Sequence, residues 1–466
     1  MARILDHLRD WLLKPVFGDH PHARQLEAIS DLLDQNPDIA RLAHEDLTRG
    51  RRSDVGRIGM TGDQVVRALL LKQIHSLSYR ALEFHLPDSI AFGSFARSPR
   101  RKPWKWTTLQ SNIKRLQAGT LEAINRILVK SAKNSGIENG AKIRTDCTAV
   151  ESNIHKPTES NLLWDSVRVL TRLLHRVQER VPSAAIHFTD HTKRARRRLL
   201  SIEFPASGKR RHRHLHKNYQ DLLKVARMTC RYVRTALDQL QVDKLRPADA
   251  GEGVAAEALS GELRKYLKTV ERLIDHTTRR VIYGEKVPTK EKVLSLFETH
   301  TDVIVKGERD IVFGHKVCLT SGASSLVTDC FVDAGNFADS TVVRPVLERQ
   351  IEIYGKPPRQ ASFDGGFASR ENLRIAKDDL HVQDVAFHKK CGLEIENMTR
   401  SPWVFRQLRR FRSGIEGIIS TLKGRGMDRC TWRSQDSLES FRCYVWSCVL
   451  AFNVTVIARH MVGNSA

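Results

Sequence analysis

The chain of 466 residues is long enough for two or three domains with a substantial hydrophobic core. Its 77 Lys and Arg against 53 Asp and Glu give a formal net charge of +24, which favours a polyanionic partner, nucleic acid before membrane, over a basic protein without an electrostatic partner. The sequence shows no apolar run near the roughly 18 residues of a membrane span, and the absence of a C-x-x-C pair argues against a zinc ribbon or a disulfide scaffold.

The N-terminal part, residues 1–135, is predicted to be a helical domain. Its first 17 residues are amphipathic and contain two Asp, without the apolar core of a signal peptide, so we expect a cytoplasmic protein. Thr61 and Gln64 have the spacing of a capping box ahead of an apolar helix. A second short helix is expected over 78–86.

These two helices are compatible with a helix-turn-helix that binds DNA, and equally with a plain αα-hairpin. The basic segment RSPRRKPWKW (97–106), in which aromatic residues alternate with cations, favours DNA binding. One further helix is predicted over 107–129.

The segment 142–156 is predicted to be a strand and its exit. Asp146 lies in a β-branched, Thr-rich stretch that is typical of a strand. A polar turn follows, which contains Asn153, His155 and Pro157.

Residues 161–285 show almost no strand pattern and are predicted to form a helical insertion, because apolar residues recur in them at helical intervals. Within it, residues 191–217 carry ten Lys or Arg and one carboxylate, Glu203. We expect a flexible phosphate-binding loop here. An idle solvated loop is the main alternative, and metal binding by His212, His214 and His216 is a weaker one, since the neighbouring cations would repel a metal ion.

The pattern changes after residue 292, where short strands joined by Gly and Ser turns are predicted over 303–305, 315–322 and 326–335. A helix (341–354), a strand that ends at Asp364, a short helix (370–377) and another strand (382–388) are expected next. A long helix containing Glu416 follows, and the tail from Leu438 to Met461 is predicted to be an apolar helix packed on the preceding domain.

Two motifs in this half have the chemistry of a ligand site. Phe363 leads into Asp364, Gly365 and Gly366, a carboxylate at the end of a short strand with glycines that allow a close neighbour. On the Glu416 helix, Ile415, Ile418, Ile419 and Leu422 form one apolar stripe.

A second stripe on that helix contains Arg412, Glu416 and Lys423. A carboxylate between two cations suits a site that handles metal and phosphate. The alternative is an ordinary surface ion pair between Arg412 and Glu416.

Together these motifs resemble those of the DDE transposases of bacterial insertion sequences, most closely the loosely classified ISNCY group. The matching segments are TDCTAVESNIHKPTESNLLWD (145–165), EKVLSLFETHTDVIVKG (291–307), FGHKV (313–317), FVDAGNFADS (331–340), SFDGGFAS (362–369) and RSGIEGIISTLKGRG (412–426). The resemblance extends from about residue 60 to the end. One departure is Arg409, which stands where related transposases often carry Tyr. An arginine at this position is still able to contact a phosphate.

The resemblance implies an α+β or α/β fold with an RNase H-like mixed sheet and flanking helices. The catalytic domain would comprise residues 136–160 and 286–430. The helical N-terminal domain would bind DNA ends, the long helical insertion would follow the first catalytic strand, and residues 431–466 would form a C-terminal helix.

The resemblance also implies that Asp146, Asp364 and Glu416 are catalytic and hold two Mg²⁺ or Mn²⁺ ions. The residues expected to contact DNA are Arg412, Lys423, Arg409, Lys316 and His155, with His155 also a candidate structural residue of its turn. Asp333 is not placed in the triad.

The implied activity is hydrolysis of phosphodiester bonds at transposon ends, followed by strand transfer into target DNA. The implied partners are terminal inverted repeats and target DNA, bound by a homodimer or a higher oligomer at the bacterial nucleoid. An RNase H-like nuclease without strand transfer and a non-catalytic DNA-binding protein are the alternatives.

Overall fold

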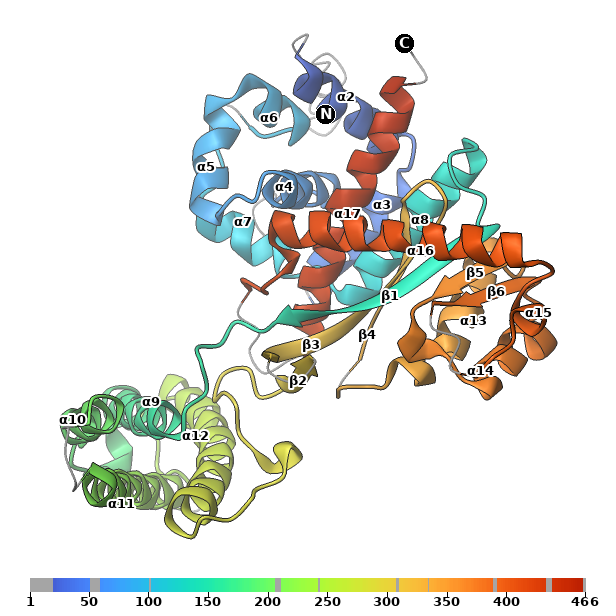
Figure 1. Ribbon diagram of the computed structural model, residues 1–466. Coiled ribbons are helices and arrows are strands. Elements are labelled where there is room, and N and C mark those ends of the chain that lie inside the picture. The colour runs from blue at the N-terminus through green and yellow to red at the C-terminus, as the bar shows by residue number, and fades with distance from the viewer. Residues whose placement is uncertain are drawn as a thin grey trace. The chain divides into compact units, whose positions relative to one another are not determined.

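A computed structural model divides the chain into two compact units, residues 1–153 with 302–466 and residues 154–301 (Figure 1). The structure describes residues 20–50, 59–99, 102–205, 211–241, 244–306, 310–333, 335–388, 392–432 and 438–463. The second unit corresponds to the expected insertion, with wider boundaries than 161–285.

The described part of the first unit contains a six-stranded mixed sheet with the strand order β2-β3-β1-β5-β6, in which β4 also pairs with β3. The strands are β1 Lys142–Glu151, β2 Asp302–Lys306, β3 Asp310–Ser321, β4 Val327–Val332, β5 Gln360–Phe363 and β6 Asp384–Phe387. β1 is antiparallel to β3 and parallel to β5, and β5 is parallel to β6. The fold is therefore a mixed α+β fold, which confirms the α+β part of the predicted fold class.

The long strand β3 places β1 inside the sheet. One edge of β3 pairs with β1, while its other edge pairs first with β2 and then, from Val317 to Ser321, with β4. Since β5 occupies the second edge of β1, the Asp146 strand has neighbours on both sides.

Helix α16 (Pro402–Leu422) crosses one face of this sheet and contacts β1, β5 and β6 (Figure 1). Ile415, Ile418 and Leu422 are buried, which confirms the predicted apolar stripe, although Ile419 is only half-buried. The remaining helices of this region are α13 Val343–Tyr354, α14 Arg370–Arg374 and α15 Ile395–Met398.

The N-terminal helices are α2 Pro21–Asp34, α3 Asp38–Thr48, α4 Gly62–Ile74, α5 Tyr79–Asp88, α6 Ile90–Phe95, α7 Trp106–Ile113 and α8 Ala118–Asn134. The capping box is confirmed, because Gln64 N donates to Thr61 Oγ1 over 3.2 Å and Thr61 N donates to Gln64 Oε1 over 3.0 Å.

The single helix predicted over 107–129 is wrong, since the chain breaks between α7 and α8. The break follows from tertiary acceptors for the first amides of α8. Gln117 N donates to Asp46 Oδ2 over 2.9 Å, and Ala118 N donates to Glu439 Oε1 over 2.7 Å.

Helix α17 (Leu438–Gly463) is the central core helix of this unit and packs on α2, α4, α8 and β4. Among the described residues it alone is long and apolar enough to cross a membrane, with a mean hydropathy of 1.5, so the expectation that no such stretch exists is wrong. Most of that stretch, 94%, is buried inside the unit, and a helix enclosed by neighbours is apolar all round.

Asn453 of α17 joins three elements through one buried amide. Its Nδ2 donates over 2.7 Å both to Asn125 Oδ1 of α8 and to the Val327 carbonyl of β4. Its Oδ1 accepts from Val327 N over 2.9 Å. The described part of residues 1–135 thus shares a core with the sheet and α17, where a separate N-terminal domain was expected.

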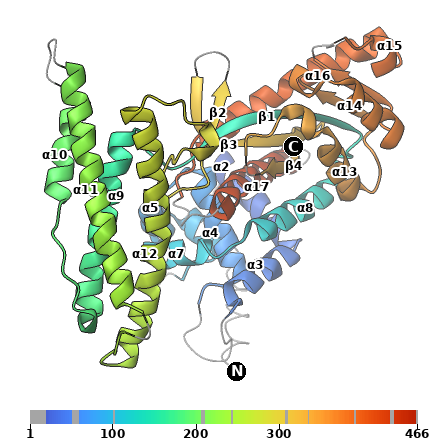
Figure 2. The ribbon, with the colours of Figure 1, turned by 90° about the horizontal axis from the view of Figure 1, so that it is seen from below.

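The second unit has its own core among α9 Glu159–Arg180, α10 Thr192–Glu203, α11 Arg211–Gln239 and α12 Ala250–Thr277 (Figure 2). The helical pattern predicted for this region is confirmed. The flexible loop predicted over 191–217 is not what the structure shows, because the described residues of that range lie mainly in α10 and α11. Buried Ala195, Leu199 and Ile202 anchor α10 to the unit.

Candidate functional site

Asp146 and Asp364 lie side by side because their strands are adjacent and parallel. The register pairs Thr145 with Phe363, and each aspartate follows directly. Asp146 lies within β1, whereas Asp364 directly follows β5 and caps a short 3₁₀ turn, Gly365–Phe367. Two carboxylates from distant parts of the sequence therefore meet at the centre of the sheet.

Helix α16 adds the third carboxylate and a buried arginine. Arg412 Nη1 lies 3.1 Å from Asp146 Oδ2 and 3.4 Å from Asp364 Oδ1, and Arg412 Nη2 lies 2.5 Å from Glu416 Oε1. The structure thus brings Asp146, Asp364 and Glu416 together around one guanidinium group. Arg412 is buried, with 8% of its surface exposed, so it is not an ordinary surface partner of Glu416.

The three carboxylates differ in their access to solvent. Their side chains are 19%, 42% and 60% exposed for Asp146, Asp364 and Glu416 respectively. Burial raises the pKa of Asp146 to about 6, and the nearby charges of Asp364 and Asp339 raise it too, while the Cys147 N–H and Arg412 oppose the rise. Asp146 is therefore the member of the group that most needs a cation at neutral pH.

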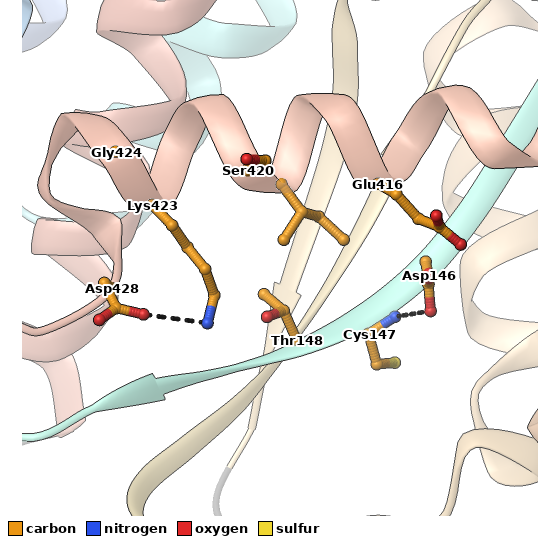
Figure 3. Close-up of a pocket in the computed structure, with 9 residues that line it drawn as sticks. Asp146, Cys147, Thr148, Glu416, Ser420, Lys423, Gly424 and Asp428 are labelled. Carbon is orange, nitrogen blue, oxygen red and sulfur yellow. Dashed lines mark hydrogen bonds and ion pairs between the residues drawn. The ribbon is translucent and has the colours of Figure 1, made fainter.

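An open pocket of about 700 Å³ lies beside these groups. It is lined by Asp146, Cys147, Thr148, Glu416, Ile419, Ser420, Lys423, Gly424 and Asp428. Figure 3 shows Glu416 pointing toward Asp146 at one end and the ion pair of Lys423 with Asp428, 3.0 Å long, at the other. A carboxylate end and a cationic group thus share one pocket.

Cys147 also lines this pocket. Its strand register places it directly opposite Cys318. Hydrogen bonding to the Cys318 thiol and burial raise the pKa of the Cys147 thiol, which disfavours the reactive thiolate form.

The chemistry of the carboxylate group fits a hard divalent cation. Carboxylate oxygens are the ligands that Mg²⁺ and Mn²⁺ prefer, and such ions commonly keep only a few protein ligands. In this conformation Arg412 takes the position between the carboxylates, and among the described residues no three His, Cys, Asp or Glu side chains stand close enough together to hold one ion. The three carboxylates are thus chemically suited to a divalent cation, but in this structure they surround the Arg412 guanidinium.

Asp339 is a neighbour of this site that the sequence reasoning missed. A Cβ on Gly366 would lie 2.9 Å from Asp339 Oδ2, so the second glycine after Asp364 accommodates this carboxylate. Asp339 Oδ1 pairs with Lys316 Nζ at 3.1 Å, and Lys316 also donates to the Phe337 carbonyl over 2.8 Å. The segment FVDAGNFADS (331–340) contains both Asp333 and Asp339, and its local pattern does not distinguish the two. Asp333 itself pairs with Arg442 at 3.3 Å.

The residues expected to contact DNA occupy different environments. Arg409 is exposed on α16, and Lys423 is partly buried at the pocket. Arg412 faces the carboxylates, so a phosphate contact would require its side chain to move. His155 belongs to the other unit, where its Nε2 lies 3.6 Å from Asp165 Oδ2, and the structure does not group it with the carboxylates.

The described residues of the N-terminal helix pair, α4 and α5, expose few cations that could contact DNA. Almost all of α4 is buried, while α5 exposes Arg80 and Phe84. In the basic segment that follows, Arg97 pairs with Asp34 at 2.6 Å and with Asp63 at 2.9 Å. Residues 100–101 of that segment lie outside the described residues, and DNA-end binding by this pair stays a prediction.

Arg144 sets the position of α16 against β1. Its Nε donates to Ser321 Oγ over 2.9 Å, its Nη2 donates to Ser325 Oγ over 3.0 Å, and its Nη1 donates to the Phe411 carbonyl over 3.0 Å. The Phe411 carbonyl belongs to the residue before Arg412. Arg144 therefore acts through the backbone of α16 to position Arg412 and Glu416.

Gly414→Ala is expected to destabilise the protein, because the new Cβ would lie 1.9 Å from Arg144 Nη1, and three hydrogen bonds hold that guanidinium in place. Overpacking of this kind costs about 1–3 kcal/mol. Gly417→Ala is the matched control, since nothing lies within 4 Å of its added Cβ, and it should stabilise the helix by up to about 1 kcal/mol. Urea unfolding of both variants measures the difference, and equal midpoints would contradict this role for Gly414.

Comparison of the chain with protein-family models, curated proteins and solved structures finds no match.

Proposed function

We propose that this chain is a DDE transposase that hydrolyses phosphodiester bonds at the ends of an insertion sequence and transfers the strands to target DNA. The observation that carries the proposal is the meeting of Asp146, Asp364 and Glu416, from two parallel strands and one helix, around Arg412. The segments that resemble those of DDE transposases contain the same three residues.

The sheet order supports an RNase H-like catalytic domain as part of the proposal. β3 pairs antiparallel with β1, β2 and β4, and β1, β5 and β6 follow side by side in that order as parallel strands. A helix that crosses this sheet then places a carboxylate beside the central strand. This arrangement of sheet and helix supports the proposed RNase H-like fold.

Asp146, Asp364 and Glu416 would hold the divalent ions, which when bound supply an activated oxygen nucleophile and neutralise the charge on the leaving oxygen. Asp146 is suited to the central position because its burial makes the carboxylate dependent on a cation. Lys423 lines the same pocket and would bind a DNA phosphate after exchanging its partner Asp428 for it.

Exposed Arg409 extends the phosphate-binding surface along α16. Lys316 is engaged with Asp339 and the Phe337 carbonyl, so its role would be to support the strand beneath the site. Action on two DNA ends implies a homodimer or larger oligomer on DNA, and a place of action at the nucleoid in the cytoplasm.

The test is an end-cleavage assay with a linear duplex that carries the inverted repeats flanking the gene. We expect nicking at the repeat ends and joining to a target plasmid with Mg²⁺ or Mn²⁺, and no product with EDTA, because the carboxylates need the ion to act on a phosphodiester. Cleavage without joining would favour a nuclease. Metal-independent binding with no cleavage would favour a DNA-binding protein, and both results would overturn the proposal.

A further inference from the structure

One face of α10 carries exposed cations that pair with no carboxylate of the described residues. Lys193, Arg196 and Arg197 stand at i, i+3 and i+4, so they share one side of the helix, and all three are exposed. The buried side of α10 lies opposite and anchors the helix to its unit.

The cations on the flank of α10 behave differently. Arg194 and Arg198 both pair with Asp221 of α11, the latter through Nε to Oδ2 at 2.6 Å. Within the described residues, no carboxylate pairs with Lys193, Arg196 or Arg197. Asp221 thus offsets one of the two charges on the flank, while the outer face stays positive.

Apolar side chains lie on the same outer face. Leu200 is 46% exposed and falls one turn beyond Arg196 and Arg197, and Phe204, just past the helix end, is 76% exposed. A face that only contacts water gains nothing from a large exposed aromatic ring beside a row of cations. This combination is typical of a surface that contacts nucleic acid.

We infer that the outer face of α10, formed by Lys193, Arg196, Arg197, Leu200 and Phe204, binds the phosphate backbone of double-stranded DNA regardless of its sequence. Phosphates supply the anions that the three cations lack, and sequence-independent binding needs no base contacts. A membrane surface fits less well, because a helix that lies on lipid presents a broad apolar face, and the apolar stripe of α10 is buried in its own unit.

This inference goes beyond the proposed catalytic function and does not depend on the carboxylates. Its test uses the full chain in EDTA and a fluorescent duplex of random sequence without inverted repeats. Affinity is measured against salt for the wild type and for the triple variant Lys193→Gln, Arg196→Gln, Arg197→Gln. The matched control is Arg264→Gln, Lys268→Gln, Arg272→Gln, which removes equal charge from exposed positions of α12, where Glu262, Glu271 and Asp275 are interspersed.

We expect the α10 triple variant to bind about tenfold or more weakly, with the slope of log affinity against log salt reduced by up to about 0.9 per lost contact. The α12 triple variant should change the affinity less than about twofold, since Glu262, Glu271 and Asp275 lower the net positive charge of that stretch, although each of them pairs with a cation outside the triple. Equal losses in both triples, or no loss in either, would overturn the inference. The inference would also be overturned if the α10 triple variant lost binding to phosphatidylserine vesicles while its affinity for the duplex stayed unchanged.

Both triples replace exposed residues by Gln, which keeps helix propensity, and thermal unfolding checks that each variant folds. If the α10 triple variant unfolds early, the double variant Arg196→Gln, Arg197→Gln decides, with an expected slope reduction of up to about 1.8. Failure of the end-cleavage assay with normal duplex binding would refute the catalytic proposal alone, so the two results are distinguishable.

Discussion

Glu416→Gln is expected to reduce end cleavage by about a thousandfold or more, equivalent to about 4 kcal/mol of transition-state stabilisation, while DNA binding is retained. Gln keeps the shape of the side chain and can still accept a hydrogen bond from Arg412, so the fold of α16 should persist. The variant loses an anionic ligand at the open side of the carboxylate group, where Glu416 is 60% exposed. Cleavage rate and duplex affinity, measured side by side, check the expectation.

Asp428→Asn is the matched control for this variant. Asp428 lines the same pocket and carries the same charge, but it pairs with Lys423 and lies apart from the carboxylates around Arg412. Its loss should slow cleavage far less than the loss of Glu416. Near-wild-type cleavage by Glu416→Gln would show that this glutamate serves only as an ion-pair partner of Arg412, and the three-carboxylate site would then fail.

Arg412→Gln is expected to lower the stability of the metal-free protein by about 3 kcal/mol, because removing one partner of a buried ion pair leaves the others uncompensated. Asp146, Asp364 and Glu416 share this guanidinium as their counter-ion. Mn²⁺ should then stabilise the variant more than the wild type, since the ion no longer competes with the arginine. Thermal unfolding with and without Mn²⁺ measures both effects.

The loss of stability in Arg412→Gln should grow with pH. The folded protein already holds the Asp146 proton more tightly than the unfolded chain, with a pKa of about 6 against an ordinary 3.8, so ionisation of Asp146 lowers stability as the pH rises through this range. Without Arg412 the pKa of Asp146 in the folded protein rises further. Ionised Asp146 then destabilises the variant more strongly at pH values above this pKa. The variant should therefore be closer to the wild type at about pH 5 than at about pH 8.

Arg409→Gln provides the comparison, because it removes the same charge three residues earlier on the same helix from an exposed position. It should leave both the metal-free stability and the response to Mn²⁺ close to those of the wild type. If Mn²⁺ stabilises Arg412→Gln no more than the wild type, the carboxylates do not form a metal site in this chain.

Patterns within single elements were predictable from the sequence alone. Helical spacing predicted the buried stripe of α16 and the helices of the second unit, and the Thr61–Gln64 capping box is present. Each of these depends on contacts within a few residues, so the local sequence determines it. Asp146, Asp364 and Glu416 were chosen as a group through the resemblance to DDE transposases.

Local patterns failed where distant residues decided the outcome. The helix predicted over 107–129 is broken because Asp46 and Glu439 provide acceptors for the amides at the start of α8. Residues 191–217 resemble a charged loop, yet their described part lies mainly in α10 and α11, where the apolar residues of α10 find a core in their unit. Arg, Lys, Ala and Leu also favour a helix locally, so a high density of charge does not by itself indicate a loop.

The candidate site shows the same division. The sequence by itself determined which carboxylates and cations the site could use. Only the tertiary structure decided that Arg412 lies among the three carboxylates, that Asp339 joins their surroundings and that His155 belongs to another unit. The physical reason is that strand register and helix packing fix these distances, and both depend on pairings between residues hundreds of positions apart.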